Sequence, residues 1–135
     1  RRVVLDGEGA TKFIEVKVKG AATFTDARDC AMAIARSALF KTAMFGMDAN
    51  WGRILAALGT APVKFNPNKV DVSFGPLKVA KDGAAMEFSE AKALGLLKRK
   101  EVEVVVDLKA GKYEATVFTS DLSYDYVKIN ANYRT

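Results

Sequence analysis

The sequence predicts a single α+β domain, residues 1–135, in which helices pack on a mainly antiparallel sheet. Several segments alternate apolar and polar residues at the period of a strand, and others repeat small or branched apolar residues at the period of a helix. Their order along the chain is strand, helix, strand, helix and then two hairpins separated by a helix, which is typical of the α+β class. The length of 135 residues, with 50% hydrophobic and 27% charged residues, fits one compact core.

The first predicted strand covers residues 14–18, in which valine and isoleucine alternate with charged residues, and Gly20 ends it. Thr25 or Asp26 is expected to cap the helix that follows. The apolar stripe of this helix consists mainly of small side chains, which allow a close approach to the sheet. The stripe contains Ala27, Cys30, Ala31, Ile34 and Ala38.

A short apolar run at residues 39–45 predicts a buried strand, which Gly46 interrupts. Asp48 or Asn50 can cap the next helix, Trp51–Leu58. Gly59 after this helix suits the left-handed conformation that often follows a helix end.

The second half of the chain predicts two hairpins and one helix. Residues 70–74 and 77–81 alternate on either side of a Gly-Pro turn, and residues 102–108 and 113–117 alternate on either side of residues 109–112. Between the hairpins, Ser89 is expected to cap a helix at residues 90–98. The predicted inner face of this helix contains Ala91, Leu94 and Leu97.

Composition argues against several classes of function. The chain has no histidine, which removes a frequent metal ligand and general base, and no metal site is expected. Cys30 is the only cysteine; we interpret it as a small core residue and expect no disulfide within the chain. No signal peptide or membrane span is visible, so we expect no membrane association and a cytoplasmic location.

The net charge of +5 permits an anionic partner, but acidic and basic residues are interspersed along the chain. A small basic α+β module that binds RNA is therefore one alternative function. The sequence has no recognisable RNA-binding fingerprint, and we expect nucleic acid not to be a physiological partner.

Three segments are more specific than packing alone requires. In residues 6–12, the glycines beside Glu8 can hold its carboxylate toward a ligand ammonium group, although a simple turn before the strand at Phe13 is the favoured interpretation from the local sequence. At the helix after Asn50, the free amides and Arg53 can bind an anion, although an ordinary capped helix with Trp51 in the core is the favoured interpretation.

The third segment, residues 121–135, is rich in aromatic and hydrogen-bonding side chains for a terminus. Such a tail should be docked on the rest of the protein. A final strand of the sheet and part of a binding site are both compatible with it.

Together, the three segments resemble the ornithine acetyltransferase family, also described as bifunctional glutamate N-acetyltransferases. The resemblance rests on DGEGATKF at residues 6–13, NWGRILAA at residues 50–57 and the tail at 121–135, and it follows the whole chain in order. It indicates the C-terminal part of that family's β chain. The chain begins with two arginines rather than methionine, and we expect it to belong to a longer protein.

Three positions depart from the family pattern. Met47 and Ala49 occupy positions where the family often has an acid and a proline, and Ser120 replaces a common cysteine. These differences leave the substrate specificity within the family open.

The resemblance implies an N-acetyltransferase of arginine biosynthesis whose precursor cleaves itself into α and β chains. The first threonine of the β chain accepts an acetyl group from N-acetylornithine, ornithine leaves, and glutamate takes the acetyl group to become N-acetylglutamate. The oxyanion-stabilising groups belong to the α chain. No catalytic residue is therefore expected in this chain, which alone should be inactive.

The positions that contact substrate in the family match Glu8, Asn130 and Thr135. The expected partners are the α chain and the remaining N-terminal part of the β chain, in an α2β2 assembly. No bound cofactor is expected, and acetyl-CoA is a candidate acetyl donor.

Overall fold

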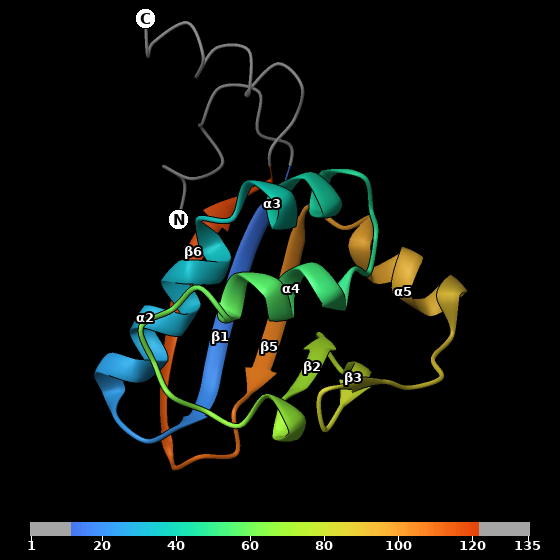
Figure 1. The fold of residues 1–135 in the computed structure, drawn as a ribbon. Helices are drawn as coiled ribbons and strands as arrows, with labels where there is room; N and C mark the ends of the chain where they lie inside the picture. The colour runs from blue at the N-terminus through green and yellow to red at the C-terminus, as the bar shows by residue number, and fades with distance from the viewer. Residues whose placement is uncertain (1–11, 122–135) are drawn as a thin grey trace, which may run out of the picture.

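A computed structural model of the chain describes residues 12–121 and consists of one six-stranded sheet with helices α2, α3 and α4 across one face (Figure 1). The strand order is β4-β3-β2-β5-β1-β6. Only the β1–β5 pair is parallel among the strand pairs of this part of the chain, so the sheet is mixed but mainly antiparallel. The predicted α+β class is confirmed.

The strands are β1 (Phe13–Ala21), β2 (Asp71–Phe74), β3 (Leu77–Lys81), β4 (Ala84–Ala85), β5 (Glu101–Asp107) and β6 (Tyr113–Ser120). The helices are α2 (Phe24–Ala35), α3 (Ala38–Phe45), α4 (Trp51–Leu58) and α5 (Glu90–Leu97), with a short 3₁₀ helix η1 (Pro67–Lys69). The hairpin predicted around the Gly-Pro turn is confirmed as β2 and β3.

The second predicted hairpin is wrong, although both of its strands exist. β1 lies between β5 and β6: Val16 of β1 pairs with Val104 of β5 on one side and with Val117 of β6 on the other. The connection from β5 to β6 passes the end of β1, where the amide of Leu108 donates to the carbonyl of Lys19 at 2.9 Å. Alternation identifies a strand but not its neighbour. It therefore cannot distinguish the short β5–β6 connection from the turn of a hairpin.

The predicted buried strand at residues 39–45 is also wrong, because this segment is helix α3. Ser37 begins the helix, and its hydroxyl oxygen accepts a hydrogen bond from the amide of Phe40 at 3.2 Å. Phe40, Ala43 and Met44 are buried at helical spacing. A short apolar run fits a buried helix as well as a buried strand. The Ser37 cap favours the helix here.

Helix α2 carries its predicted stripe, since Ala27, Cys30, Ala31 and Ile34 are buried. Its cap is Thr23, whose hydroxyl oxygen accepts from the amide of Asp26, rather than Thr25 or Asp26 itself. Ala38, predicted as the end of this stripe, belongs to α3 instead.

Helices α4 and α5 are confirmed with two corrections. Asn50 and Ser89 are their caps, but Gly59 has a φ of −64° and so is right-handed, not left-handed. In α5 the buried residues are Ala93 and Leu97, whereas Leu94 is exposed. The helix is therefore rotated relative to the prediction, which also placed the exposed Ala91 inside.

Candidate functional site

Two of the three segments singled out in the sequence meet at the end of the sheet where β1 begins and β6 finishes. The backbone amide of Lys12 donates to the carboxylate of Asp121 at 2.7 Å, and the amide of Asp121 donates back to the carbonyl of Lys12 at 3.4 Å. The Asp121 side chain is completely buried. Residues 109 positions apart are thus joined where the chain enters and leaves the described region.

The neighbouring residues fix this end of the sheet. The rings of Phe13 and Phe118 stack with centroids 5.2 Å apart, and the amide of Phe13 donates to the carbonyl of Lys100 at 2.7 Å. On the helix-covered face, the hydroxyl of Thr119 donates to the carbonyl of Ala35 at the end of α2. The strand ends are therefore held to each other and to a helix.

The third segment forms the connection between α3 and α4. The side-chain oxygen of Asn50 accepts from the amide of Arg53 at 3.0 Å, and its side-chain nitrogen donates to Asp48 at 3.2 Å. The guanidinium of Arg53 donates to the carbonyl of Leu39 at 3.1 Å, which ties α4 to the first turn of α3. Trp51 packs against the core. These contacts support the capped-helix interpretation and give Arg53 a structural partner.

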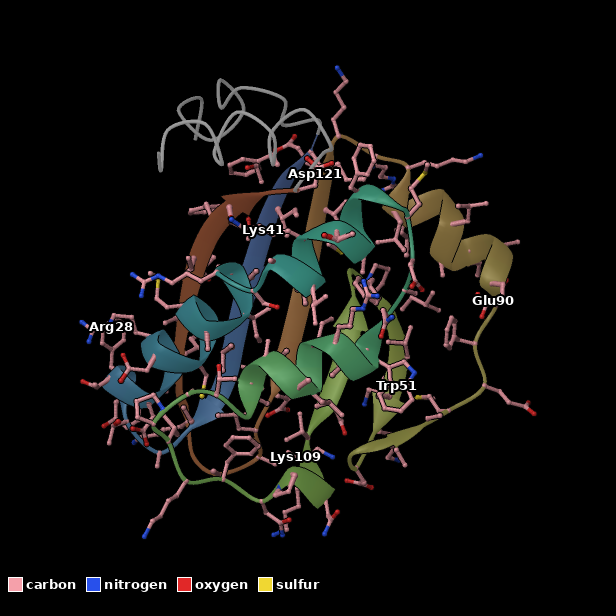
Figure 2. All side chains as sticks on the ribbon, turned by 45° about the horizontal axis from the view of Figure 1, so that its top comes forward. Arg28, Lys41, Trp51, Glu90, Lys109 and Asp121 are labelled. Atoms are coloured by element: carbon pink, nitrogen blue, oxygen red, sulfur yellow. The ribbon has the colours of Figure 1, made fainter. Side chains whose placement is uncertain are left out.

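Lys41 on α3 is a residue that the sequence analysis missed. It is partly buried, and this burial lowers the pKa of its ammonium group. Within residues 12–121 its ammonium group has no hydrogen-bond or ion-pair partner. Figure 2 shows Lys41 and Asp121 toward the same end of the molecule. A single lysine in an apolar run was the available signal, but the strand prediction placed it on the wrong kind of element.

A cluster of charged residues around the buried Asp71 lies at the opposite end of the sheet. The Asp71 carboxylate accepts from the ammonium groups of Lys78 and Lys109, each at 2.9 Å, and from the amide of Asp82 at 3.0 Å. Burial favours a higher pKa for Asp71, but these hydrogen bonds outweigh it and lower the pKa from 3.8 to about 2. The partners come from β3, the turn after it and the β5–β6 connection, so the cluster holds the fold together.

Cys30 is buried within α2, and burial followed by the charges of Asp26 and Asp29 raises the pKa of its thiol to about 11. A thiol of this kind is a poor nucleophile near neutral pH. The interpretation of Cys30 as a core residue is confirmed.

Two open hollows lie on the helical side. One, of about 860 Å³, lies beside α2 and the end of α4, and its lining includes Arg28 and Arg36. Another, of about 390 Å³, is lined by Trp51, Phe88 and the carboxylates of Asp48 and Glu90.

The described part of the chain has neither a candidate metal site nor a candidate membrane-spanning helix. Between residues 12 and 121, no cluster of His, Cys, Asp and Glu could hold a metal ion. No helix in the same region has the length and apolar character needed to cross a bilayer.

The model of the ArgJ family matches residues 1–135, which is the entire chain. The chain belongs to the ArgJ family. It is 53% identical to the arginine biosynthesis bifunctional protein ArgJ of Symbiobacterium thermophilum and 49% identical over 143 aligned positions to the glutamate N-acetyltransferase of Methanocaldococcus jannaschii. All of this chain aligns in both cases, but it spans only 34% and 36% of the two relatives. The resemblance recognised in the sequence is therefore confirmed.

A crystal structure of the ArgJ protein of Bacillus halodurans has the same fold. The TM-score is 0.92 at 42% sequence identity, with 98% of this chain and 62% of the crystallised chain covered. ArgJ relatives thus contain substantial structure beyond the region that this chain spans.

The three predicted substrate-binding residues, Glu8, Asn130 and Thr135, lie outside the described residues and remain predictions. Lys12 and Asp121, the described ends of the segments to which these residues belong, are hydrogen-bonded to each other.

Proposed function

We propose that this chain forms the substrate-binding part of an ornithine acetyltransferase that moves an acetyl group from N-acetylornithine to glutamate. The observation that carries the proposal is the match of the ArgJ family along all 135 residues. The names of the relatives, an arginine biosynthesis bifunctional protein and a glutamate N-acetyltransferase, support the same chemistry.

In the proposed reaction, a threonine from the part of the enzyme beyond this chain is the nucleophile. Its hydroxyl oxygen attacks the acetyl carbonyl carbon of N-acetylornithine, the C–N bond breaks, and the hydroxyl proton passes to the departing amine. The α-amine of glutamate then attacks the acetyl-threonine ester, the C–O bond breaks, and a proton returns to the threonine oxygen. The covalent intermediate divides a single difficult transfer into two easier steps.

The role of this chain is to position the amino-acid substrates. The Glu8 carboxylate is suited to pair with an ammonium group, the Asn130 amide both donates and accepts, and Thr135 offers a hydroxyl. Glu8 is four residues before Lys12, so a fully extended chain keeps it within about 14 Å of the Lys12–Asp121 contact. This limit is compatible with a pocket at this end of the sheet.

A chimera provides the test. The matching third of the Symbiobacterium protein is replaced by this chain, and the purified protein is incubated with N-acetylornithine, with and without glutamate. We expect N-acetylglutamate in the complete reaction. Without glutamate, mass spectrometry should find one acetyl group on a threonine outside this chain. The 135-residue chain alone should transfer no acetyl group. A chimera that assembles like the relative but forms neither product nor acetyl-threonine would disprove the proposal.

A further inference from the structure

Helix α3 carries large apolar residues on its exposed surface as well as on its buried face. Phe40, Ala43 and Met44 face the core, whereas Leu39 is 63% exposed and Phe45 is 41% exposed. Met47, two residues after the end of the helix, is also exposed. These three residues are close in sequence, while the other large exposed hydrophobic residues of the described region are distributed over α2, α5 and β6.

The exposed face is a continuous strip along the helix. Leu39, Thr42 and Phe45 follow one another at three-residue spacing, which places them on one side. The hydroxyl of Thr42, the polar member, donates to the carbonyl of Ala38 at 2.8 Å, so its proton is already used within the helix. We call Leu39, Thr42, Phe45 and Met47 the outer strip of α3.

The strip is held in a fixed position. Arg53 of α4 binds the carbonyl of Leu39, and Ser37 caps the helix. Large exposed apolar residues that cluster on a rigid surface mark an interface. The outer strip therefore has the character of a surface that another element covers.

Lys41 adds a charge next to the strip, four residues before Phe45. Its ammonium group is partly desolvated and has no partner within the described part of the chain. A complementary surface would therefore be apolar with a carboxylate near Lys41.

We infer that the outer strip of α3 is the docking surface for the part of the ArgJ-family protein that this chain does not span. The chain covers 34% of the Symbiobacterium relative and 62% of the crystallised Bacillus chain. The remaining part of such a protein is large enough to cover the strip. The inference rests on the proposed function only in its choice of partner, and it concerns assembly rather than acetyl transfer.

Thiol labelling tests the inference, because the native Cys30 is buried and its raised pKa keeps it unreactive. Leu39→Cys and Phe45→Cys probe the strip. Phe24→Cys and Leu94→Cys are matched controls, at positions 56% and 41% exposed on other helices. Maleimide labelling rates are measured by peptide mass spectrometry in the isolated chain and in the Symbiobacterium chimera.

All four thiols should react rapidly in the isolated chain. In the chimera the two strip thiols should react at least about tenfold more slowly, while the controls keep their rates. Equal rates for strip and control thiols in the chimera would overturn the inference. If the chimera does not fold, the same comparison is made in the unmodified Symbiobacterium protein, at the residues aligned with these four, and is judged by the same criterion.

Two further outcomes would identify a different occupant and also overturn the inference. Protection that appears in the isolated chain as its concentration rises would indicate a second copy. Slow labelling in the isolated chain that is relieved by removing residues 122–135 would indicate the chain's own tail. Acetyl transfer is measured separately: a protected strip without transfer rejects the proposed function alone, and transfer with an unprotected strip rejects the docking surface alone.

Discussion

The Asp71 carboxylate connects parts of the chain that are distant in sequence, and its charge should make stability depend on pH. Its folded pKa is lowered from 3.8 to about 2, so its contribution is complete above pH 4 and is lost as the pH falls toward 2. This pKa difference means that the Asp71 carboxylate contributes on the order of 2 kcal/mol to the free energy of unfolding. Urea unfolding at pH 5 and at pH 2.5 should reveal this loss.

Asp71→Asn tests whether this carboxylate is responsible. The amide keeps an oxygen for the Asp82 amide but cannot balance the charges of Lys78 and Lys109, so we expect unfolding at pH 7 to become easier by about 1–3 kcal/mol. The variant should also lose less stability between pH 5 and pH 2.5. Asp29→Asn, which breaks the exposed pair with Arg28, is the control and should change little. Identical pH profiles for Asp71→Asn and the parent would show that other carboxylates are responsible.

Cys30 shows how one buried thiol can report on folding. Because it is buried and its pKa is about 11, we expect no measurable reaction with a thiol reagent at pH 7.5 in the folded chain. It should react completely once guanidinium unfolds the protein. Rapid reaction under native conditions, at a rate near that of the exposed thiol in Leu94→Cys, would contradict the burial of α2 against the sheet.

At the scale of elements, a glycine within a helix and a glycine in a connection between strands should respond oppositely to alanine. A Cβ on Gly111 would overlap the backbone of Ala21 and Ala22, where the β5–β6 connection passes the end of β1. A Cβ on Gly95 within α5 would meet no atom within 4 Å. Gly111→Ala should therefore lower the free energy of unfolding by about 1–3 kcal/mol, and Gly95→Ala should raise it by about 0.5–1 kcal/mol.

Thermal or urea unfolding of the two variants checks this prediction. Both substitutions add one methyl group, so the opposite signs would reflect the surroundings of the two glycines: an open helix surface at Gly95 and a close backbone contact at Gly111. If Gly111→Ala is as stable as the parent, the connection does not approach β1 as closely as described, and the order β5-β1-β6 is called into question.

The elements also show where sequence reasoning succeeds and fails. Caps correctly predict where α4 and α5 begin, because Asn50 and Ser89 act through residues only three positions away. The position of β1 between β5 and β6 depends on pairing across about a hundred residues, which alternation within each strand cannot express. Helix α3 was mistaken for a strand because its outer strip is apolar, a property that a buried strand and a docking helix share.

At the scale of the whole molecule, the Lys12–Asp121 contact brings together the described ends of two segments that are far apart in the sequence. The sequence identified residues 6–12 and 121–135 separately, and the family resemblance alone placed them in one pocket. Their junction is a tertiary contact between residues 109 positions apart. Lys41 and the outer strip were not predicted, because their importance depends on which face of α3 the sheet leaves exposed.

The tail should accordingly act in catalysis rather than in folding. In the chimera, Asn130→Ala and removal of Thr135 should each lower acetyl transfer by about a hundredfold, because a displaced positioning group costs on the order of that factor. Glu8→Gln should weaken transfer as well, since it removes the negative charge proposed to pair with an ammonium group. The rates of N-acetylglutamate formation are compared at saturating and at low N-acetylornithine.

Lys128→Ala is the control within the same tail, and we expect its transfer rate to stay close to that of the parent. Folding is monitored in every variant by the reactivity of Cys30, which lies in α2 rather than in the tail. A loss of transfer accompanied by a reactive Cys30 would reveal a folding defect instead of a lost substrate contact. Full transfer after removal of Thr135 and in Asn130→Ala would reject the tail as part of the pocket. Glu8 would then be the remaining proposed substrate contact in this chain, and the search for the others would move to the part of the ArgJ-family protein that this chain does not span.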